Sequence, residues 1–189
     1  MVDDTDTIFA LSSGSGAAGV AVIRISGSAV LRVLKRMVAG RAPLPRLATL
    51  RTLRHPVSQE VLDRGLVLHM PGPGSFTGED CLEFHVHGGR AVTRAVLAAL
   101  ECLDGLRPAE PGEFTRRAFD HGRLDLTNVE GLAELVAAET ESQRRLALKV
   151  ASGALSEIYL EMREAMLEGR ALLEAQIDFS DEDDVEEID

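Results

Sequence analysis

The sequence has little cysteine and few aromatic residues: two cysteines, one tyrosine and no tryptophan among 189 residues. Two cysteines, Cys81 and Cys102, are too few for a disulfide framework, and we expect a protein of the reducing cytoplasm. Long uncharged hydrophobic runs are also missing, so the sequence predicts no transmembrane span and no membrane partner. The start MVDDTDTIF is acidic and lacks the basic residues that open a signal peptide.

A large basic patch is missing as well. The formal net charge is -11, from 31 acidic and 20 basic residues. Nine of the acidic residues lie within 171–189, where there is no Lys or Arg, which leaves 22 acidic against 20 basic residues in the rest of the chain. A strong electrostatic binder of nucleic acid is therefore excluded. We expect the acidic run to be a solvated tail.

The remaining pattern predicts a mixed N-terminal part followed by a helical one. Period-two alternation and turn residues predict strands at 7–11, 20–26, 49–54, 66–70 and 81–87. Periodicity near 3.6 predicts helices at about 29–38, 90–103 and 115–121.

From Val129 onward the pattern is helical throughout. Thr127 and Asn128 are candidate caps of a first helix, and a second helical stretch is expected from Ser142 to Ile177, longer than the roughly 8–20 residues of a typical globular helix. A long amphipathic helix must lay its apolar stripe on another surface. We therefore expect either a fragment of a longer protein or a dimer.

The glycine-rich stretch GSGAAG, residues 14–19, has the letters of a dinucleotide-binding fingerprint. That fingerprint requires the glycines to open a helix, whereas here the strand pattern VAVIRI follows them. A phosphate-binding G-x-x-x-x-G-K-[ST] loop occurs nowhere in the sequence. A flexible connection between strands is the simpler interpretation.

The segment CLEFHVH, residues 81–87, puts Glu83, His85 and His87 on one strand face and its apolar residues on the other. Same-face neighbours on a strand stand about 7 Å apart, too far for three of them to share one ion through bonds of about 2 Å. We expect no metal site. Either the row is a solvated face, or it is a pocket wall whose carboxylate accepts hydrogen bonds from two adjacent N–H donors of a ligand. His85 and His87 receive no role.

Two arginines are further candidates. Arg24 lies inside the apolar strand pattern VIRIS, where its charge requires a partner. It either forms an internal salt bridge, lies at an exposed strand end, or binds the carboxylate or carbonyl of a ligand. Arg123 follows Gly122 at a predicted helix end, where the helix dipole favours a cation.

Five segments together resemble a known family. In order, they are VAVIRISG, PGPGSFTGEDCLEFHVHGG, EPGEFTRRAFDHGRLDL, NVEGLAELVAAET and AQIDFSDED. They are similar to the N-terminal part of the tRNA modification GTPases (MnmE, also called TrmE), and the similarity covers nearly the whole chain.

The resemblance implies an α+β fold: a mixed β-sheet with packed helices, of the folate-binding, aminomethyltransferase-like kind, in residues 1–120. This domain is expected to bind a tetrahydrofolate derivative, in the 5-formyl or 5,10-methylene form, and to form a homodimer. Residues 121–189 are expected to be the first helices of a partial all-α domain. The family's folate contacts fall on Arg24, Glu83 and Arg123, the last of which is often Lys in the family.

The resemblance also implies a function for a longer parent protein. With an FAD-dependent partner subunit (MnmG/GidA type), the parent is expected to use GTP, with Mg and K, to form a 5-carboxymethylaminomethyl-type modification of the wobble uridine of tRNA. The sequence lacks the GTPase phosphate loop and the family's C-x-G-K ending, so we expect no catalytic residue here. The alternatives are a free-standing folate-dependent one-carbon transferase and a purely structural dimerisation domain.

Overall fold

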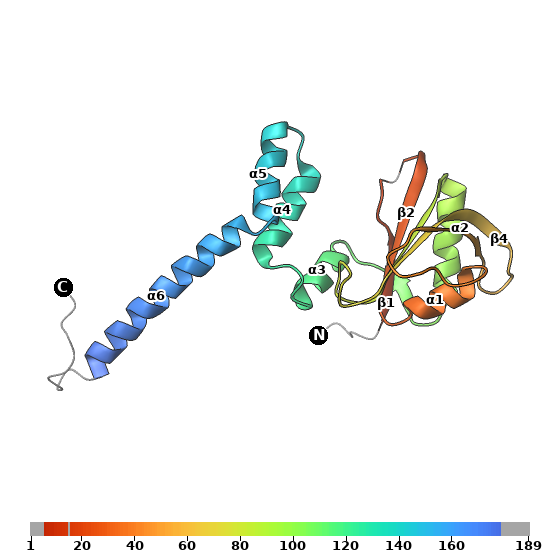
Figure 1. Cartoon of the computed structure of the whole chain (residues 1–189). Coiled ribbons are helices and arrows are strands. Elements are labelled where there is room, and N and C mark those ends of the chain that lie inside the picture. The colour runs from red at the N-terminus through yellow and green to blue at the C-terminus, as the bar shows by residue number, and fades with distance from the viewer. Residues whose placement is uncertain (1–5, 15, 179–189) are drawn as a thin grey trace. The chain divides into compact units, whose positions relative to one another are not determined.

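A computed structural model describes residues 6–14 and 16–178 of the chain (Figure 1). The chain divides into two compact units, Met1–Leu124 and Asp125–Asp189, each described by itself below. None of the described helices combines the length and the apolar character needed to cross a membrane. The predicted acidic tail beyond residue 178 lies outside the described residues.

The first unit is built on a six-stranded sheet of order β3-β4-β5-β2-β1-β6. Neighbouring strands are antiparallel except β1 and β6, which are parallel, so the sheet is mixed. The α+β fold expected from the sequence is confirmed. The strands are β1 Thr7–Leu11, β2 Ala18–Ser26, β3 Thr49–Arg54, β4 Val61–Met70, β5 Cys81–Gly88 and β6 Leu106–Pro108.

Two helices, α1 (Val30–Met37) and α2 (Arg90–Glu101), pack against one face of this sheet. The core contains Ile23 and Phe84, which face each other across β2 and β5 and are fully buried. Because side chains alternate along a strand, the neighbouring pair of Arg24 and Glu83 lies on the opposite face. A third helix, α3 (Glu113–Asp120), follows β6.

The second unit consists of α4 (Leu126–Ala137), α5 (Glu141–Ala151) and α6 (Ala154–Asp178). Helices α4 and α5 approach closely at Gly131, where an added Cβ would lie 2.4 Å from the backbone nitrogen of Ala151. Only a residue without a side chain fits this contact.

Two local predictions in the second unit are wrong. The N-cap of α4 is Asp125, whose carboxylate accepts a hydrogen bond from the backbone N–H of Asn128, so Thr127 and Asn128 lie inside the helix. The expected continuous helix from Ser142 to Ile177 is broken after Ala151. Gly153 has φ +90°, the left-handed conformation that ends helices and that glycine adopts at little cost.

Candidate ligand-binding site

Arg24 and Glu83 form an ion pair on the sheet face opposite α1 and α2. They are directly opposed in the β2–β5 register. Nε and Nη2 of Arg24 lie 2.9 Å and 2.8 Å from Oε1 of Glu83. The Glu83 side chain is 11% exposed and that of Arg24 is 27% exposed. The structure therefore gives Arg24 the internal partner that its place in an apolar strand requires.

The remaining members of the polar row have separate partners. Nε2 of His85 lies 3.1 Å from Oε2 of Glu83, so both carboxylate oxygens are engaged. His87, whose side chain is 72% exposed, bonds instead to Asp63 through its ring and its backbone N–H. Burial opposes ionisation of Asp63, but these bonds from His87 outweigh it and lower the pKa of Asp63. Within residues 6–14 and 16–178, no group of three or more His, Cys, Asp or Glu could hold a metal ion.

Two aromatic rings border the Arg24 guanidinium. Its Cζ lies 5.2 Å from the ring centroid of Phe76, in the loop between β4 and β5. It also lies 5.8 Å from the ring centroid of Phe114, on α3. Both distances suit cation–π attraction. The guanidinium is thus held by a carboxylate and two rings, and none of the described residues accepts a hydrogen bond from its Nη1.

Arg123 is exposed and lies just beyond the end of α3. Its backbone N–H donates to the carbonyl of Ala118 at 2.8 Å, which closes the helix end. Its stem packs beside Gly78: an added Cβ there would lie 3.4 Å from Cγ of Arg123 and 2.8 Å from Cβ of His121. In the described part of the chain no contact joins Arg123 to Arg24 or Glu83.

A small hollow of about 250 Å³ lies close to this segment. Its lining residues are Gly27, Ser28, Glu79, Asp80 and His121.

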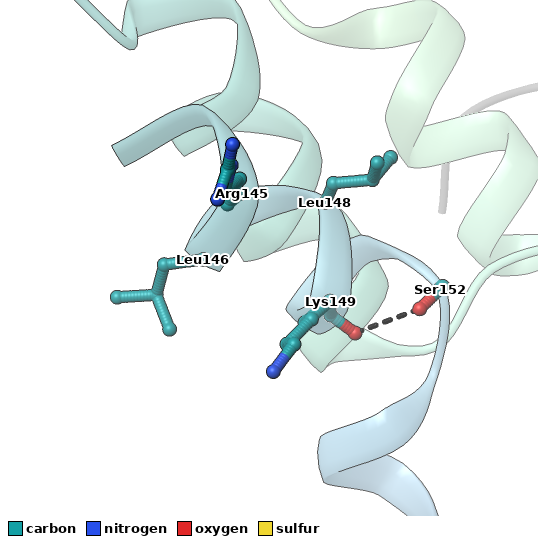
Figure 2. A pocket seen from close by; sticks show the side chains of 5 residues that line it. All are labelled: Arg145, Leu146, Leu148, Lys149 and Ser152. Atoms are coloured by element: carbon teal, nitrogen blue, oxygen red, sulfur yellow. Dashed lines mark hydrogen bonds between the residues drawn. The ribbon is translucent and has the colours of Figure 1, made fainter. Parts of the chain in front are cut away.

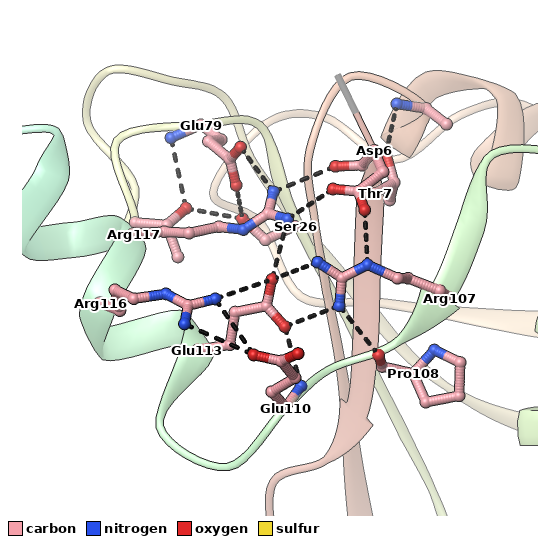
Figure 3. Close-up of polar contacts among 12 residues, drawn as sticks. Asp6, Thr7, Ser26, Glu79, Arg107, Pro108, Glu110, Glu113, Arg116 and Arg117 are labelled. Atoms are coloured by element: carbon pink, nitrogen blue, oxygen red, sulfur yellow. Dashed lines mark hydrogen bonds and ion pairs between the residues drawn. The ribbon is translucent and has the colours of Figure 1, made fainter. Parts of the chain in front are cut away.

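A partly buried ion network includes Glu79, and the sequence analysis did not predict it (Figure 3). Arg117, 5% exposed, donates from Nη1 to Oε1 of Glu79 at 2.9 Å and from Nη2 to Oε1 of Glu113 at 3.1 Å. Arg107 binds both oxygens of Glu113, at 2.8 Å and 2.6 Å. Asp6 accepts from both arginines. The motif EPGEFTRR contains Glu113 and Arg117, but Glu79 and Asp6 lie on distant segments of the chain, so the spacing within the motif does not reveal the network.

The network shifts the pKa values of its members. Burial raises the pKa of Glu113, but bonds from Arg107, Glu110 and Arg117 outweigh it and hold the value at about 2. Bonds to Glu113 and Asp6 raise the pKa of Arg107. Burial likewise opposes ionisation of Asp6, yet its bonds to the two arginines lower its pKa. The ionised forms of Glu113, Arg107 and Asp6 are therefore stabilised by their partners.

The helical unit carries a larger hollow, of about 840 Å³, along α5 (Figure 2). Its lining residues are Arg145, Leu146, Leu148, Lys149 and Ser152. The one hydrogen bond drawn there runs from the Ser152 hydroxyl to the Lys149 carbonyl. No acid and no histidine lines it, and Leu146 is exposed. Its chemistry does not define a site, and the candidate ligand-binding site is the one at Arg24 and Glu83.

Fold and site together define an α+β module with a buried, ion-paired carboxylate on one sheet face, followed by an all-α module. Residues 7–123 match the family described as "GTP-binding protein TrmE N-terminus", and residues 126–189 match the "MnmE helical domain". The chain belongs to this family, and the resemblance inferred from its motifs is confirmed.

Individual relatives support the same assignment. The chain is 58% identical over 181 residues to the tRNA modification GTPase MnmE of Sinorhizobium medicae, covering 96% of this chain and 41% of the relative. It is 57% identical over 184 residues to the mitochondrial 5-taurinomethyluridine-[tRNA] synthase subunit GTPB3 of Mus musculus, covering 97% of this chain and 37% of the relative. The chain thus spans about two fifths of the curated relatives it matches.

Proposed function

We propose that this chain is the tetrahydrofolate-binding and dimerisation module of a tRNA-modifying GTPase. The observation that carries the proposal is the buried Glu83 carboxylate, paired with Arg24 on the sheet face that α1 and α2 leave uncovered. Family membership and the activity of the related tRNA modification GTPases support the activity proposed for the parent protein.

The carboxylate suits a pterin. The 2-amino group and N3–H of a pterin are adjacent donors, and a carboxylate can accept both in one plane through charge-assisted hydrogen bonds. Glu83 has about four lone-pair positions, and Arg24 and His85 already use both of its oxygens. Binding two ligand donors therefore requires Arg24 or His85 to shift.

The two arginines suit the rest of a folate. Arg24 keeps Nη1 available for a ligand carbonyl or carboxylate. Arg123 is an exposed cation on the same unit and can bind a glutamate carboxylate of the ligand. We propose Arg24, Glu83 and Arg123 as the cofactor-binding residues, and a reduced folate in its 5-formyl or 5,10-methylene form as the cofactor.

The uncovered sheet face also supports a homodimer. Val20, Leu50 and Leu66 are 57%, 48% and 41% exposed. Leu66 pairs with Leu50 on one side and His85 on the other, so these leucines share the face of Glu83. Neighbouring apolar side chains on an exposed sheet face favour burial against another surface, and we propose that a second copy of the chain provides it.

The parent protein is proposed to act in the cytoplasm. There it forms, with an FAD-dependent partner subunit (MnmG/GidA type), a 5-carboxymethylaminomethyl-type group on the wobble uridine of tRNA. GTP, Mg and K belong to the parent, and tRNA is bound by the full complex. The relatives include both bacterial and mitochondrial proteins.

A calorimetric titration of the chain with 5-formyltetrahydrofolate tests the proposal. Saturable binding that is lost in Arg24→Ala supports it. Absence of binding would leave a structural dimerisation domain, and a gene without a downstream GTPase reading frame would favour a free-standing one-carbon transferase.

A further inference from the structure

The two rings beside Arg24 directly neighbour buried polar residues in the sequence. Phe76 lies between Ser75 and Thr77, which are 4% and 0% exposed. Phe114 follows Glu113, which is 1% exposed. In both segments the polar residues next to the ring are buried and hydrogen-bonded, so the position of each ring depends on its neighbours.

The loop that carries Phe76 is tied to the strand that carries Arg24. Ser26, two residues beyond Arg24, has its hydroxyl 2.7 Å from that of Thr77. The same hydroxyl donates to Oε2 of Glu79 at 2.6 Å. The Ser75 hydroxyl donates to the backbone carbonyl of Glu79. Glu79 is therefore the carboxylate that closes the loop onto β2.

The helix that carries Phe114 is tied to β6 in a similar way. Glu113 accepts from Arg107 at both oxygens and from the backbone N–H of Glu110 at 2.8 Å. This carboxylate fixes the first turn of α3, where Phe114 is the second residue.

One side chain bonds to both carboxylates. Arg117 donates from Nη1 to Glu79 and from Nη2 to Glu113, so the loop and the helix share a single guanidinium (Figure 3). A planar fork can serve two acceptors in fixed directions, whereas the point charge of a lysine cannot.

We infer that Arg117 is a positioning residue of the candidate site. It fixes the positions of the Phe76 and Phe114 rings, which in turn border the Arg24 guanidinium. The inference rests on the proposed function, because its main test measures the affinity for a reduced folate. Buried ion pairs contribute little to net stability. Here the ion pairs connect the loop that carries Phe76 to the helix that carries Phe114, and both segments border the Arg24 side chain. Arg117 itself does not touch the proposed ligand.

The test compares Arg117→Lys with Arg116→Lys. Arg116 precedes it on α3, is 43% exposed, and makes only longer contacts, at 3.4 Å to Glu110 and 3.7 Å to Glu113. Calorimetric titration with 5-formyltetrahydrofolate should show at least about a tenfold loss of affinity in Arg117→Lys and less than about a twofold change in Arg116→Lys, tenfold corresponding to roughly 1.4 kcal/mol. Unchanged affinity in a folded Arg117→Lys protein overturns the inference.

A double-mutant cycle separates positioning from general destabilisation. Phe76→Leu with Phe114→Leu removes both rings, and Arg117→Lys is then added on that background. If Arg117 acts through the rings, its effect on affinity shrinks to less than about twofold, since effects transmitted through a shared contact are not additive. The same tenfold loss on both backgrounds contradicts the inference.

Glu79→Gln provides a second variant if Arg117→Lys does not fold. It weakens the loop contact and leaves the Arg107–Glu113 pair intact, and it should reduce affinity in the same direction. If neither variant folds, the network serves the fold and the inference is overturned.

An NMR measurement on the ligand-free protein tests this inference separately from the proposed function. The Nε–H NMR signal of Arg24, assigned by its loss in Arg24→Lys, should shift in Arg117→Lys or Glu79→Gln and stay in place in Arg116→Lys. If the unmodified chain binds no reduced folate, the proposed function fails, and this signal alone decides whether Arg117 positions the rings.

Discussion

Glu83 is the residue on which the proposed chemistry depends most directly. In Glu83→Gln one acceptor oxygen becomes an amide donor, which faces the donors of the pterin. A lost charge-assisted bond together with that clash should cost on the order of 2–4 kcal/mol of binding. The affinity for 5-formyltetrahydrofolate should fall by about 30- to 1,000-fold, measured by calorimetry.

The fold should suffer less than the binding. Gln keeps an oxygen that accepts from Arg24, and the Arg24 side chain is 27% exposed, so its charge is not fully buried when the carboxylate is lost. His87→Gln is the control, since His87 lies on the same strand with a side chain that is 72% exposed. If the thermal melt of Glu83→Gln collapses while its affinity survives, Glu83 is a structural residue.

Glu113 should make the stability of the first unit depend on pH in the acid range. Its pKa in the fold is about 2, below the ordinary 4.5. A carboxyl group with a lowered pKa stabilises the fold fully above pH 4.5, and this contribution is lost as the pH falls from 4.5 towards 2. By pH 3 roughly 2 kcal/mol of unfolding free energy should be gone.

Urea unfolding at pH 7 and pH 3 measures this loss. In Glu113→Gln the decrease between the two pH values should be smaller by roughly 2 kcal/mol. Glu141→Gln is the matched control: hydrogen bonds from Arg144 and Arg145 lower the pKa of Glu141 to about 2 as well, but its side chain is 57% exposed. Solvent screens such exposed pairs, so this variant should keep the pH dependence of the unmodified chain.

The contact between helices α4 and α5 depends on one glycine, Gly131. In Gly131→Ala the new Cβ would lie 2.4 Å from the backbone nitrogen of Ala151, so the helices must separate. Overpacking of this kind costs about 1–3 kcal/mol, which exceeds the gain of about 1 kcal/mol in helix propensity. Thermal unfolding followed by circular dichroism should show a lower melting temperature.

Gly169→Ala should have the opposite effect. Gly169 lies in α6, and an added Cβ there would meet no atom within 4 Å. Only the propensity gain of about 1 kcal/mol then operates, and the helix should melt at a higher temperature. Equal effects of the two substitutions would contradict the close packing of α4 on α5.

The whole molecule is expected to be a dimer through its first unit. Sedimentation equilibrium should give twice the chain mass of 20.4 kDa. Leu50→Glu puts a charge on the uncovered sheet face and should shift the equilibrium towards the monomer. Val136→Glu is the control, since Val136 is 83% exposed on α4. A monomer mass at every concentration would contradict the homodimer, and a dimer that survives Leu50→Glu would place the interface elsewhere.

The chain by itself is also expected neither to bind nor to hydrolyse GTP. The sequence has no glycine-rich loop that ends in Lys followed by Ser or Thr, the element that holds the phosphates. Equilibrium binding of a labelled GTP analogue should show no saturation at micromolar concentration. Saturable binding at that concentration would require a nucleotide site of another kind.

Local patterns in the sequence predicted much of this fold. Alternation placed the buried Phe84 and the polar Glu83 on opposite faces of one strand, because side-chain direction reverses at each residue. The strand β6 was missed, since three residues that include a proline carry no periodic signal. The break at Gly153 was missed because a glycine is tolerated inside a helical pattern, and only the backbone conformation shows that it ends one.

For the site, the sequence by itself indicated two charged residues within apolar strand patterns, Arg24 and Glu83, and a third, Arg123, at a helix end. The tertiary structure alone decided how they are partnered. It paired Arg24 with Glu83, set two rings beside that pair, and joined Glu79, Glu113 and Arg117. These partners are brought together by strand register and by the packing of α3, which depend on the whole chain, whereas a sequence pattern records only neighbours along it.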